Sequence, residues 1–179
     1  MPVLCFNPTT DALFAPQEKS QLYEAEFSQP CLAAIQIILV DLLRSCRVGP
    51  AAVVRHSSGE TGAGYAANVI TAKDAMILAY HRGQITPPLK AAHRGGMAAV
   101  GMGREEVEPY LRTGVIVGCE NSPSNVSLSG DSDVLERVME DIRHKRPEVL
   151  CRPLQVECGY HSRKFLPLTS LLRQLFCLS

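Results

Sequence analysis

Tryptophan is absent from this 179-residue sequence, and neither sign of charge is in excess. Lysine and arginine together number 18, as do aspartate and glutamate, so the formal net charge is zero. A neutral chain has no general attraction to nucleic acid or to an anionic membrane surface. We therefore expect neither as a partner, and any anion must be bound locally, by a placed arginine or a helix N-terminus.

Signals for secretion and membrane insertion are also missing. Residues 1–15 lack a basic region followed by an apolar run, so they do not form a secretory signal. No stretch reaches the roughly 18 apolar residues that a membrane-spanning helix needs. The sequence predicts a soluble, cytoplasmic protein.

The seven cysteines are odd in number and include no C-x-x-C pair. No pair has finger-like spacing, so no zinc or other metal site is expected. Several cysteines lie inside apolar runs, as Cys31 and Cys119 do. We interpret them as reduced, mostly buried thiols of a cytosolic protein.

Apolar residues make up 46% of the chain and charged residues 20%, which is typical of a globular protein with a sizeable core. Residues 1–27 are predicted to be irregular because three prolines interrupt them. Ser28 and Pro30 then predict the start of a helix. Residues 31–45 are apolar on nearly every side, which predicts a helix buried within the domain.

Strands and helices alternate in the next part of the chain. Residues 51–54 are apolar without alternation, which predicts a strand covered on both faces in a parallel sheet. Residues 61–68 are rich in small side chains and predict a tightly packed helix. A further helix is expected over residues 71–84. This order predicts an α/β fold.

From residue 95 the predicted order becomes β-α-β-β-α-β, which is the pattern of a ferredoxin-like unit. The expected strands are residues 97–100, 115–119, 126–129 and 150–156, and the expected helices are residues 104–111 and 133–145. This unit spans about 95–157 and interrupts the α/β core. We therefore divide the chain into a partial α/β core (1–94), a ferredoxin-like small subdomain (95–157) and a return to the core (158–179).

The string Arg55-His56-Ser57-Ser58-Gly59 lies between a predicted strand and a predicted helix, which is the pattern of a nucleophile elbow. Such a turn holds the serine hydroxyl at its tip, where the N–H of Ser58 can stabilise an oxyanion. Gly59 is the small residue that the turn needs, whereas Arg55 is expected to crowd the helix. Serine and glycine are also common in ordinary strand-to-helix connections, so the string by itself leaves that alternative open.

Seven blocks together resemble the acyltransferase domain of polyketide synthases, most closely the fungal iterative type. The wider family is that of malonyl-CoA:acyl carrier protein transacylases, and the resemblance covers about residues 10–164. The blocks are Ser28-Gln29-Pro30, Val53-Val54-Arg55-His56-Ser57-Ser58-Gly59-Glu60, Tyr80-His81-Arg82-Gly83-Gln84, Met97-Ala98-Ala99-Val100-Gly101, Glu120-Asn121-Ser122-Pro123, Leu128-Ser129-Gly130-Asp131 and Tyr160-His161-Ser162.

The resemblance implies an α/β-hydrolase-like parallel-sheet core with an inserted ferredoxin-like subdomain, and a two-step acyl transfer. Ser57 attacks the thioester of malonyl-CoA while His161 takes its proton. The malonyl group then passes to the phosphopantetheine thiol of an acyl carrier protein, in polyketide or fatty-acid biosynthesis. No cofactor is bound tightly, coenzyme A enters as the thioester substrate, and other synthase domains are expected partners.

Further site residues follow from the same resemblance. Arg82 matches the arginine that grips the malonyl carboxylate, for which its planar fork is suited. His56 lines the pocket, Tyr160 narrows it in favour of malonyl over methylmalonyl, and Asn121 lies in a loop near it. Without the resemblance, Arg82 would be interpreted as an exposed helix-end arginine, Tyr160 as a packing residue and His161 as a solvated loop histidine.

Three departures from the family pattern are evident. Residues 1–27 contain no counterpart of the Gly-Gln-Gly type loop that completes the family's oxyanion hole, so the first core strand is expected to be missing. Arg55 stands where glycine is usual, and residues 165–179 do not resemble the family's continuation. We therefore expect an acyltransferase fragment truncated at both ends. Two alternatives are a non-catalytic remnant or interaction module, and a serine hydrolase or thioesterase, against which the carboxylate clamp at Arg82 argues.

Overall fold

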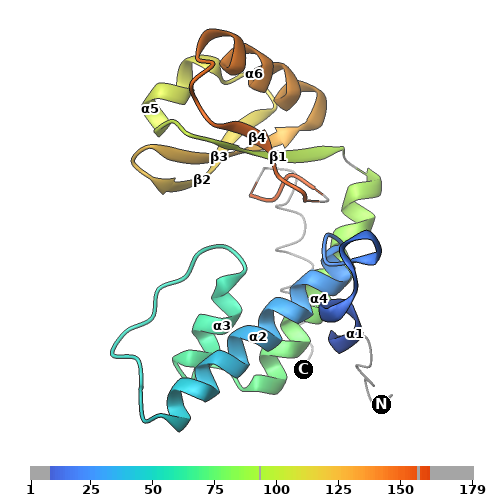
Figure 1. The fold of residues 1–179 in the computed structure, drawn as a ribbon, viewed down its shortest axis with the longest axis vertical. Coiled ribbons are helices and arrows are strands. Elements are labelled where there is room, and N and C mark those ends of the chain that lie inside the picture. The colour runs from blue at the N-terminus through green and yellow to red at the C-terminus, as the bar shows by residue number, and fades with distance from the viewer. Residues whose placement is uncertain (1–8, 93, 157, 162–179) are drawn as a thin grey trace. The chain divides into compact units, whose positions relative to one another are not determined.

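The computed structural model describes residues 9–92, 94–156 and 158–161 (Figure 1). The chain divides into two compact units, residues 1–85 and 86–179, and we describe each by itself. Among the described residues, the first unit contains helices, and the second contains a four-stranded sheet with two covering helices.

The helices of the first unit begin earlier in the chain than predicted. Residues expected to be irregular form α1 and the 3-10 helix η1, and α2 starts before Ser28. The amides of Phe27 and Ser28 donate to the carbonyl of Glu24 at 3.1 and 2.9 Å, so the first turn of α2 closes ahead of Pro30. The bounds are α1 Thr9–Phe14, η1 Gln17–Lys19, α2 Ala25–Ser45, α3 Gly59–Ala66 and α4 Ala72–Ala92.

Small residues let the helices of this unit approach one another. A Cβ placed on Gly83 of α4 would lie 2.8 Å from the carbonyl oxygen of Ala25, so only glycine allows α2 and α4 to pack this closely. Gly62 of α3 lies in the same way against the side chain of Gln36 in α2. The tightly packed helix predicted from small residues is confirmed, with bounds Gly59–Ala66.

Helix α3 is also tied to α2 by polar contacts. The hydroxyl of Tyr65 donates to Asp41 at 2.6 Å. The guanidinium of Arg44 donates to the Tyr65 carbonyl at 3.1 Å and to the side-chain oxygen of Asn68 at 2.7 Å, and it lies 4.8 Å from the centre of the Tyr65 ring. The end of α3 is therefore anchored to α2.

The burial predicted for the apolar helix is wrong for much of its surface. Only one side of α2 is buried, at Ala25, Pro30, Cys31, Ala33 and Ile37. By length and composition alone, α2 could cross a membrane, contrary to our expectation from the sequence. The core helix of a soluble protein passes the same test.

The strand predicted at residues 51–54 does not form. This segment has two bends followed by irregular backbone and no paired strand, and Val54 is 95% exposed. A strand needs neighbours that accept and donate its ladder hydrogen bonds. The described residues of the first unit contain no strand that could pair with residues 51–54. An apolar sequence is therefore not enough to form a strand here.

The second unit has the predicted ferredoxin-like order. Its strands are β1 (Gly95–Val100), β2 (Val115–Ser122), β3 (Asn125–Asp131) and β4 (Cys151–Pro153), and its helices are α5 (Arg104–Val107) with the 3-10 helix η2 (Glu108–Tyr110), and α6 (Ser132–Lys145). The sheet order is β2-β3-β1-β4 with every pair antiparallel. The β-α-β-β-α-β prediction is confirmed.

The core of this unit lies between α6 and one face of the sheet (Figure 1). Leu135, Val138, Met139 and Ile142 recur at helical spacing on α6 and are buried. They pack with sheet and connecting residues that are almost completely inaccessible, namely Ala98, Val100, Met102, Val107, Val126 and Leu128. Helix α6 thus covers one face of the sheet, and the other face is left to contact the segment that follows β4.

Candidate functional site

Ser57 lies at the tip of a tight turn that opens α3. The amide of Gly59 donates to the carbonyl of His56 at 3.0 Å, and the amide of Glu60 donates to the carbonyl of Ser57 at 3.3 Å. Ser58 is the N-cap residue, so Ser57 stands at the positive end of the helix dipole. An anion that develops on an acyl group at Ser57 would be stabilised there.

The backbone of Ser57 adopts the left-handed conformation, with φ of +52°. Among the described residues, the other non-glycine residues with positive φ are Arg47, Asn68 and His161. Arg47 and Asn68 each follow the last turn of a helix, where this conformation is common. Ser57 and His161 do not end a helix. Strained backbone of this kind clusters at functional sites, and it is the geometry of a nucleophile elbow.

Arg55 does not crowd α3, contrary to our expectation. Its Nε lies 3.1 Å from a carboxylate oxygen of Glu60, and both side chains are largely exposed. A Cβ placed on Gly59 would meet no atom within 4 Å, so the expectation that the turn needs a small residue there is also wrong. The crowding is absent because residues 51–56 are exposed along their whole length, which leaves the Arg55 side chain room beside the helix.

The remaining first-unit candidates lie around the turn and on α4. His56 is exposed and Ser58 is half-buried, next to Ser57 on either side. Arg82 is half-buried on α4, directly before Gly83, which is where α4 meets the start of α2. Arg82 therefore lies where two helices pack closely, and not at an exposed helix end.

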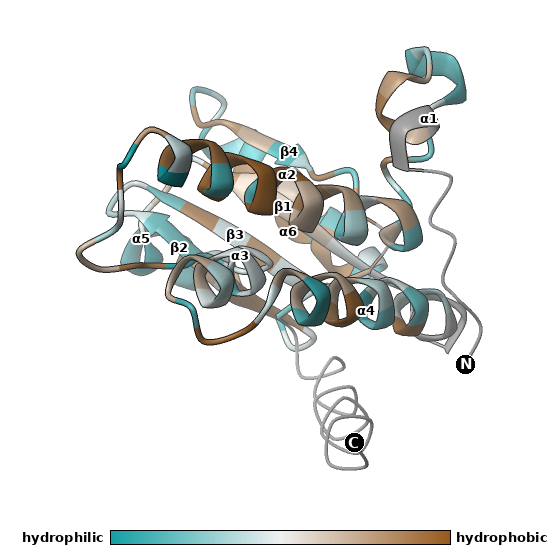
Figure 2. Ribbon diagram, turned by 90° about the horizontal axis from the view of Figure 1, so that it is seen from below, coloured by the Kyte–Doolittle hydropathy of each residue, from teal (hydrophilic) through white to brown (hydrophobic). Residues whose placement is uncertain are grey.

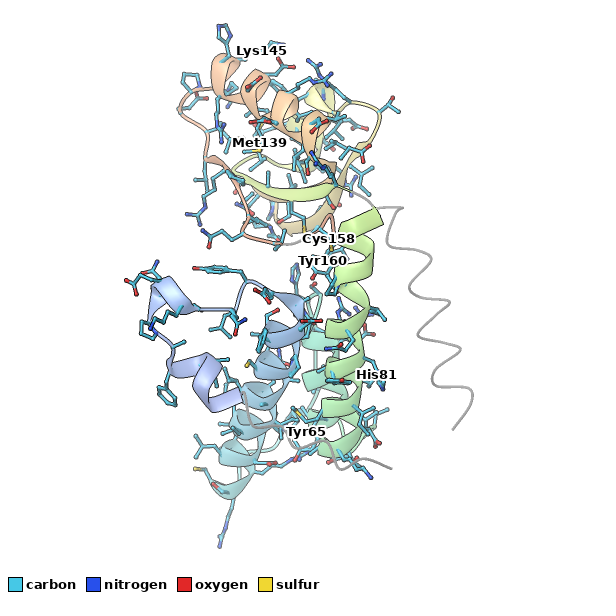
Figure 3. The ribbon with its side chains drawn as sticks, turned by 90° about the vertical axis from the view of Figure 1, so that its right-hand side faces the viewer. Tyr65, His81, Met139, Lys145, Cys158 and Tyr160 are labelled. Carbon is cyan, nitrogen blue, oxygen red and sulfur yellow. The ribbon has the colours of Figure 1, made fainter. Side chains whose placement is uncertain are left out.

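His161 and Tyr160 lie on the face of the sheet opposite α6. Figure 3 shows Tyr160 and Cys158 on the far side of the sheet from Met139 of α6. The buried hydroxyl of Ser129 donates to the carbonyl of Tyr160 at 2.5 Å. A Cβ placed on Gly118 of β2 would lie at an ordinary contact distance of 3.5 Å from the Cβ of His161, so the histidine lies beside this strand.

Asn121 forms side-chain hydrogen bonds across the β2–β3 hairpin. Its side-chain amide donates to Asn125 at 2.8 Å and to the hydroxyl of Ser127 at 3.1 Å. These bonds hold the two strands together near the hairpin end. The structure therefore accounts for Asn121 without a substrate.

The structure thus places His56, Ser57, Ser58 and Arg82 in the first unit, and Asn121, Tyr160 and His161 in the second. Within the first unit the turn gathers His56, Ser57 and Ser58, while Arg82 lies on another helix. Within the second unit Tyr160 and His161 share one turn, and Asn121 belongs to the hairpin. The divergent tail predicted at residues 165–179 lies outside the described residues.

One residue that holds the histidine segment was not predicted as functional. Ser129 acts through Tyr160, as its hydrogen bond to the Tyr160 carbonyl indicates. Ser129 belongs to one of the blocks that carry the family resemblance, which was a usable signal.

Cysteine is a poor alternative nucleophile in this chain. Burial raises the pKa of the Cys31, Cys119 and Cys151 thiols, which disfavours the reactive thiolate. In the part of the chain that the structure describes, no three His, Cys, Asp or Glu side chains gather as a metal site would require. The expectation that no metal is bound stays a prediction.

Comparison with known proteins identifies the family of this chain, which carries the turn at Ser57 and the ferredoxin-like unit. The family model for the acyl transferase domain matches residues 8–176. The chain belongs to the acyl transferase domain family.

Particular relatives narrow this further. The chain is 54% identical over 152 residues to the highly reducing polyketide synthase gloL of Glarea lozoyensis, which covers 85% of this chain and 6% of that synthase. The acyltransferase domain from the second module of the salinomycin polyketide synthase matches with a TM-score of 0.79 and 31% identity, over 94% of this chain and 40% of that chain. The malonyl-CoA:ACP transacylase of Synechocystis matches with a TM-score of 0.74 and 29% identity, over 88% of this chain and 53% of that chain.

These matches confirm the α/β acyltransferase fold and the resemblance to fungal polyketide synthases. The chain spans a small part of the synthases and about half of the solved transacylases.

Proposed function

We propose that the chain is the catalytic part of a malonyl-specific acyltransferase of polyketide biosynthesis. The malonyl group moves from coenzyme A to the hydroxyl of Ser57, and from there to the phosphopantetheine thiol of an acyl carrier protein. The other domains of a cytoplasmic polyketide synthase are the expected neighbours.

The observation that carries this proposal is the left-handed backbone of Ser57 at the N-terminus of α3. Ser57 Oγ attacks the thioester carbonyl while its proton passes to the imidazole of His161. The C–S bond breaks, and the departing thiolate of coenzyme A takes that proton. In the second half the carrier thiol gives its proton to His161 and attacks the ester carbonyl, the C–Oγ bond breaks, and His161 returns the proton to Ser57 Oγ. The amide of Ser58 stabilises the oxyanion in both halves.

Arg82 is proposed to bind the malonyl carboxylate. A guanidinium presents two parallel N–H donors to a carboxylate and keeps its charge at any working pH. A neutral acyl group has no use for such a clamp, so Arg82 favours malonyl over acetyl transfer. Tyr160 and His56 are proposed to line the pocket, with Tyr160 excluding the extra methyl of methylmalonyl. Such exclusion is worth roughly 1–3 kcal/mol.

The test is acylation of the purified chain with labelled malonyl-CoA, followed by mass spectrometry of the peptide that contains Ser57. We expect the malonyl ester on Ser57, no ester in Ser57→Ala, and retained ester in the matched control Ser58→Ala, whose backbone amide is intact. A chain with native circular dichroism that never carries label on Ser57 contradicts the proposal.

The role of Arg82 is tested by comparing malonyl-CoA with acetyl-CoA. Loss of a charge-assisted pair should reduce malonylation about 10- to 100-fold in Arg82→Ala. Acetylation should change little. If Arg82→Ala reduces both equally, Arg82 does not bind the carboxylate. Rapid release of acetate from acetyl-CoA, without transfer to a carrier, would instead identify a thioesterase.

A second candidate function is a non-catalytic interaction module. It is favoured by the exposed, unpaired state of residues 51–54 directly before Ser57. In the full elbow this segment is a strand that supports the nucleophile. The two candidates differ in one result: a non-catalytic module keeps its cellular effect in Ser57→Ala, and an acyltransferase loses it.

A further inference from the structure

Strand β3 presents different residues to the two faces of the sheet. Val126 and Leu128 belong to the core beneath α6, and Ser127 and Ser129 alternate with them, so the serines face the other way. Hydrophobic and polar residues thus alternate along this strand (Figure 2). Both serines are buried, and the side chain of Ser129 is 0% exposed. A hydroxyl that is buried so completely needs a hydrogen-bond partner.

The partner of Ser129 is the segment that carries the proposed base. The hydroxyl of Ser129 donates to the carbonyl oxygen of Tyr160 at 2.5 Å. That carbonyl belongs to the peptide group that joins Tyr160 to His161, and a peptide group is planar and rigid. The hydrogen bond therefore fixes the plane from which the backbone of His161 continues. His161 has a φ of +63°, a conformation that a residue with a Cβ keeps only where its surroundings hold it.

Glycines let the same segment lie directly against the sheet. A Cβ placed on Gly159 would lie 3.1 Å from the Ser129 Oγ and 3.1 Å from the carbonyl oxygen of Gly130. A Cβ placed on Gly95 of β1 would lie 2.7 Å from the amide nitrogen of Gly159, which is closer than real Cβ atoms come to other atoms. Cys158 and Gly159 are both buried. The backbone before the histidine is therefore held against β1 and β3.

His161 itself is exposed, although the residues just before Tyr160 are buried. Packing does not fix the direction of an exposed ring, so the position of the imidazole depends on where its backbone is held. A general base must lie within hydrogen-bond reach of the proton that it takes, and a misplacement of about 1 Å can cost about 100-fold in rate. The bond from Ser129 therefore bears on the rate of acyl transfer as well as on stability.

We propose that Ser129 is the positioning residue of the base His161. Its hydroxyl holds the peptide group between Tyr160 and His161, so that the imidazole stays where it can take the proton of Ser57. The effect on acyl transfer rests on the proposed function, whereas the anchoring of His161 does not. Because Ser129 acts only through the backbone of this segment, its loss slows acylation without weakening the binding of malonyl-CoA.

The test compares Ser129→Ala with a matched control and a second variant. The control is Ser127→Ala, which removes a buried hydroxyl from the same face of β3. The Ser127 hydroxyl accepts a hydrogen bond from Asn121 of the hairpin at 3.1 Å, so its loss should not move the histidine. The second variant, Gly159→Ala, keeps Ser129 and adds a Cβ that displaces the segment from β3 by a few tenths of an ångström.

Two measurements are made on each folded variant. Single-turnover malonylation of Ser57 should be roughly 10- to 100-fold slower in Ser129→Ala and in Gly159→Ala, with little change in the malonyl-CoA concentration that gives half the maximal rate. Nuclear magnetic resonance of the chain with isotope-labelled histidine reports the imidazole directly. His161→Gln identifies the His161 signal among those of the five histidines. This signal should move in Ser129→Ala and Gly159→Ala and stay in place in Ser127→Ala.

The two measurements separate this inference from the proposed function. If the unchanged chain is malonylated and Ser129→Ala is malonylated as fast, Ser129 does not position the base. Equal slowing in Ser127→Ala would also overturn the proposal, because the hydroxyls would then support only the sheet. If the unchanged chain carries no malonyl ester, the proposed function is wrong, and the His161 signal alone decides whether Ser129 anchors the histidine. If Ser129→Ala does not fold, Gly159→Ala decides by the same two measurements.

Discussion

Glycine at position 57 should stabilise the fold while it abolishes acyl transfer. Ser57 holds a φ of +52°, which is costly for a residue with a Cβ. The left-handed conformation costs about 1–2 kcal/mol for an L-residue, and glycine avoids this. Glycine also makes the unfolded chain more flexible, which offsets about 0.4–1 kcal/mol. Ser57→Gly should therefore unfold with a free energy about 0.5–1 kcal/mol higher than Ser57→Ala.

Both substitutions remove the hydroxyl, so their difference isolates the backbone conformation. Equilibrium unfolding in urea, followed by far-ultraviolet circular dichroism, should show a midpoint roughly 0.2–1 M higher for Ser57→Gly, since small proteins lose about 1–3 kcal/mol per molar urea. Neither variant should carry a malonyl ester.

Glycine substitutions at two further positions serve as controls for the stability difference at Ser57. Ala63 lies inside α3, where glycine should destabilise by about 1 kcal/mol. Arg47 follows the end of α2 with a φ of +61°, so glycine there should not destabilise. If Ser57→Gly proves no more stable than Ser57→Ala while Ala63→Gly loses stability as expected, the turn does not store strain at Ser57.

Three other outcomes follow from the structure. Ser129→Ala removes the hydroxyl that donates to the Tyr160 carbonyl, so we expect a loss of about 1 kcal/mol and faster hydrogen exchange around residue 160. The side-chain hydroxyl and the backbone amide of Thr71 donate to Asp74, and these bonds lower the pKa of the Asp74 carboxyl below its ordinary value. The support that ionised Asp74 gives to the start of α4 should therefore be present above the ordinary pKa and lost as pH falls through the lowered pKa. Asp74→Asn should lack this part of the acid unfolding curve. A thiol reagent should modify the exposed Cys46 before the buried cysteines, as site-resolved mass spectrometry would show.

Local patterns in the sequence predicted the helices and strands whose packing partners lie close by in the sequence. The ferredoxin-like order follows from strands and helices whose partners all lie between residues 95 and 153. The small residues of α3 likewise predicted a tightly packed helix, because Gly62 packs against the side chain of Gln36 in the neighbouring helix α2. The family blocks located Ser57 and His161 by position alone.

Tertiary structure determined what depends on distant neighbours. Residues 51–54 have the composition of a buried strand, yet they form none, because no strand of the first unit's described residues pairs with them. Helix α2 is apolar enough for a core, yet only one side is buried, where it meets its neighbouring helices. The left-handed backbone of His161 also had no local signal, because it arises where a connecting segment lies across a sheet formed elsewhere in the chain.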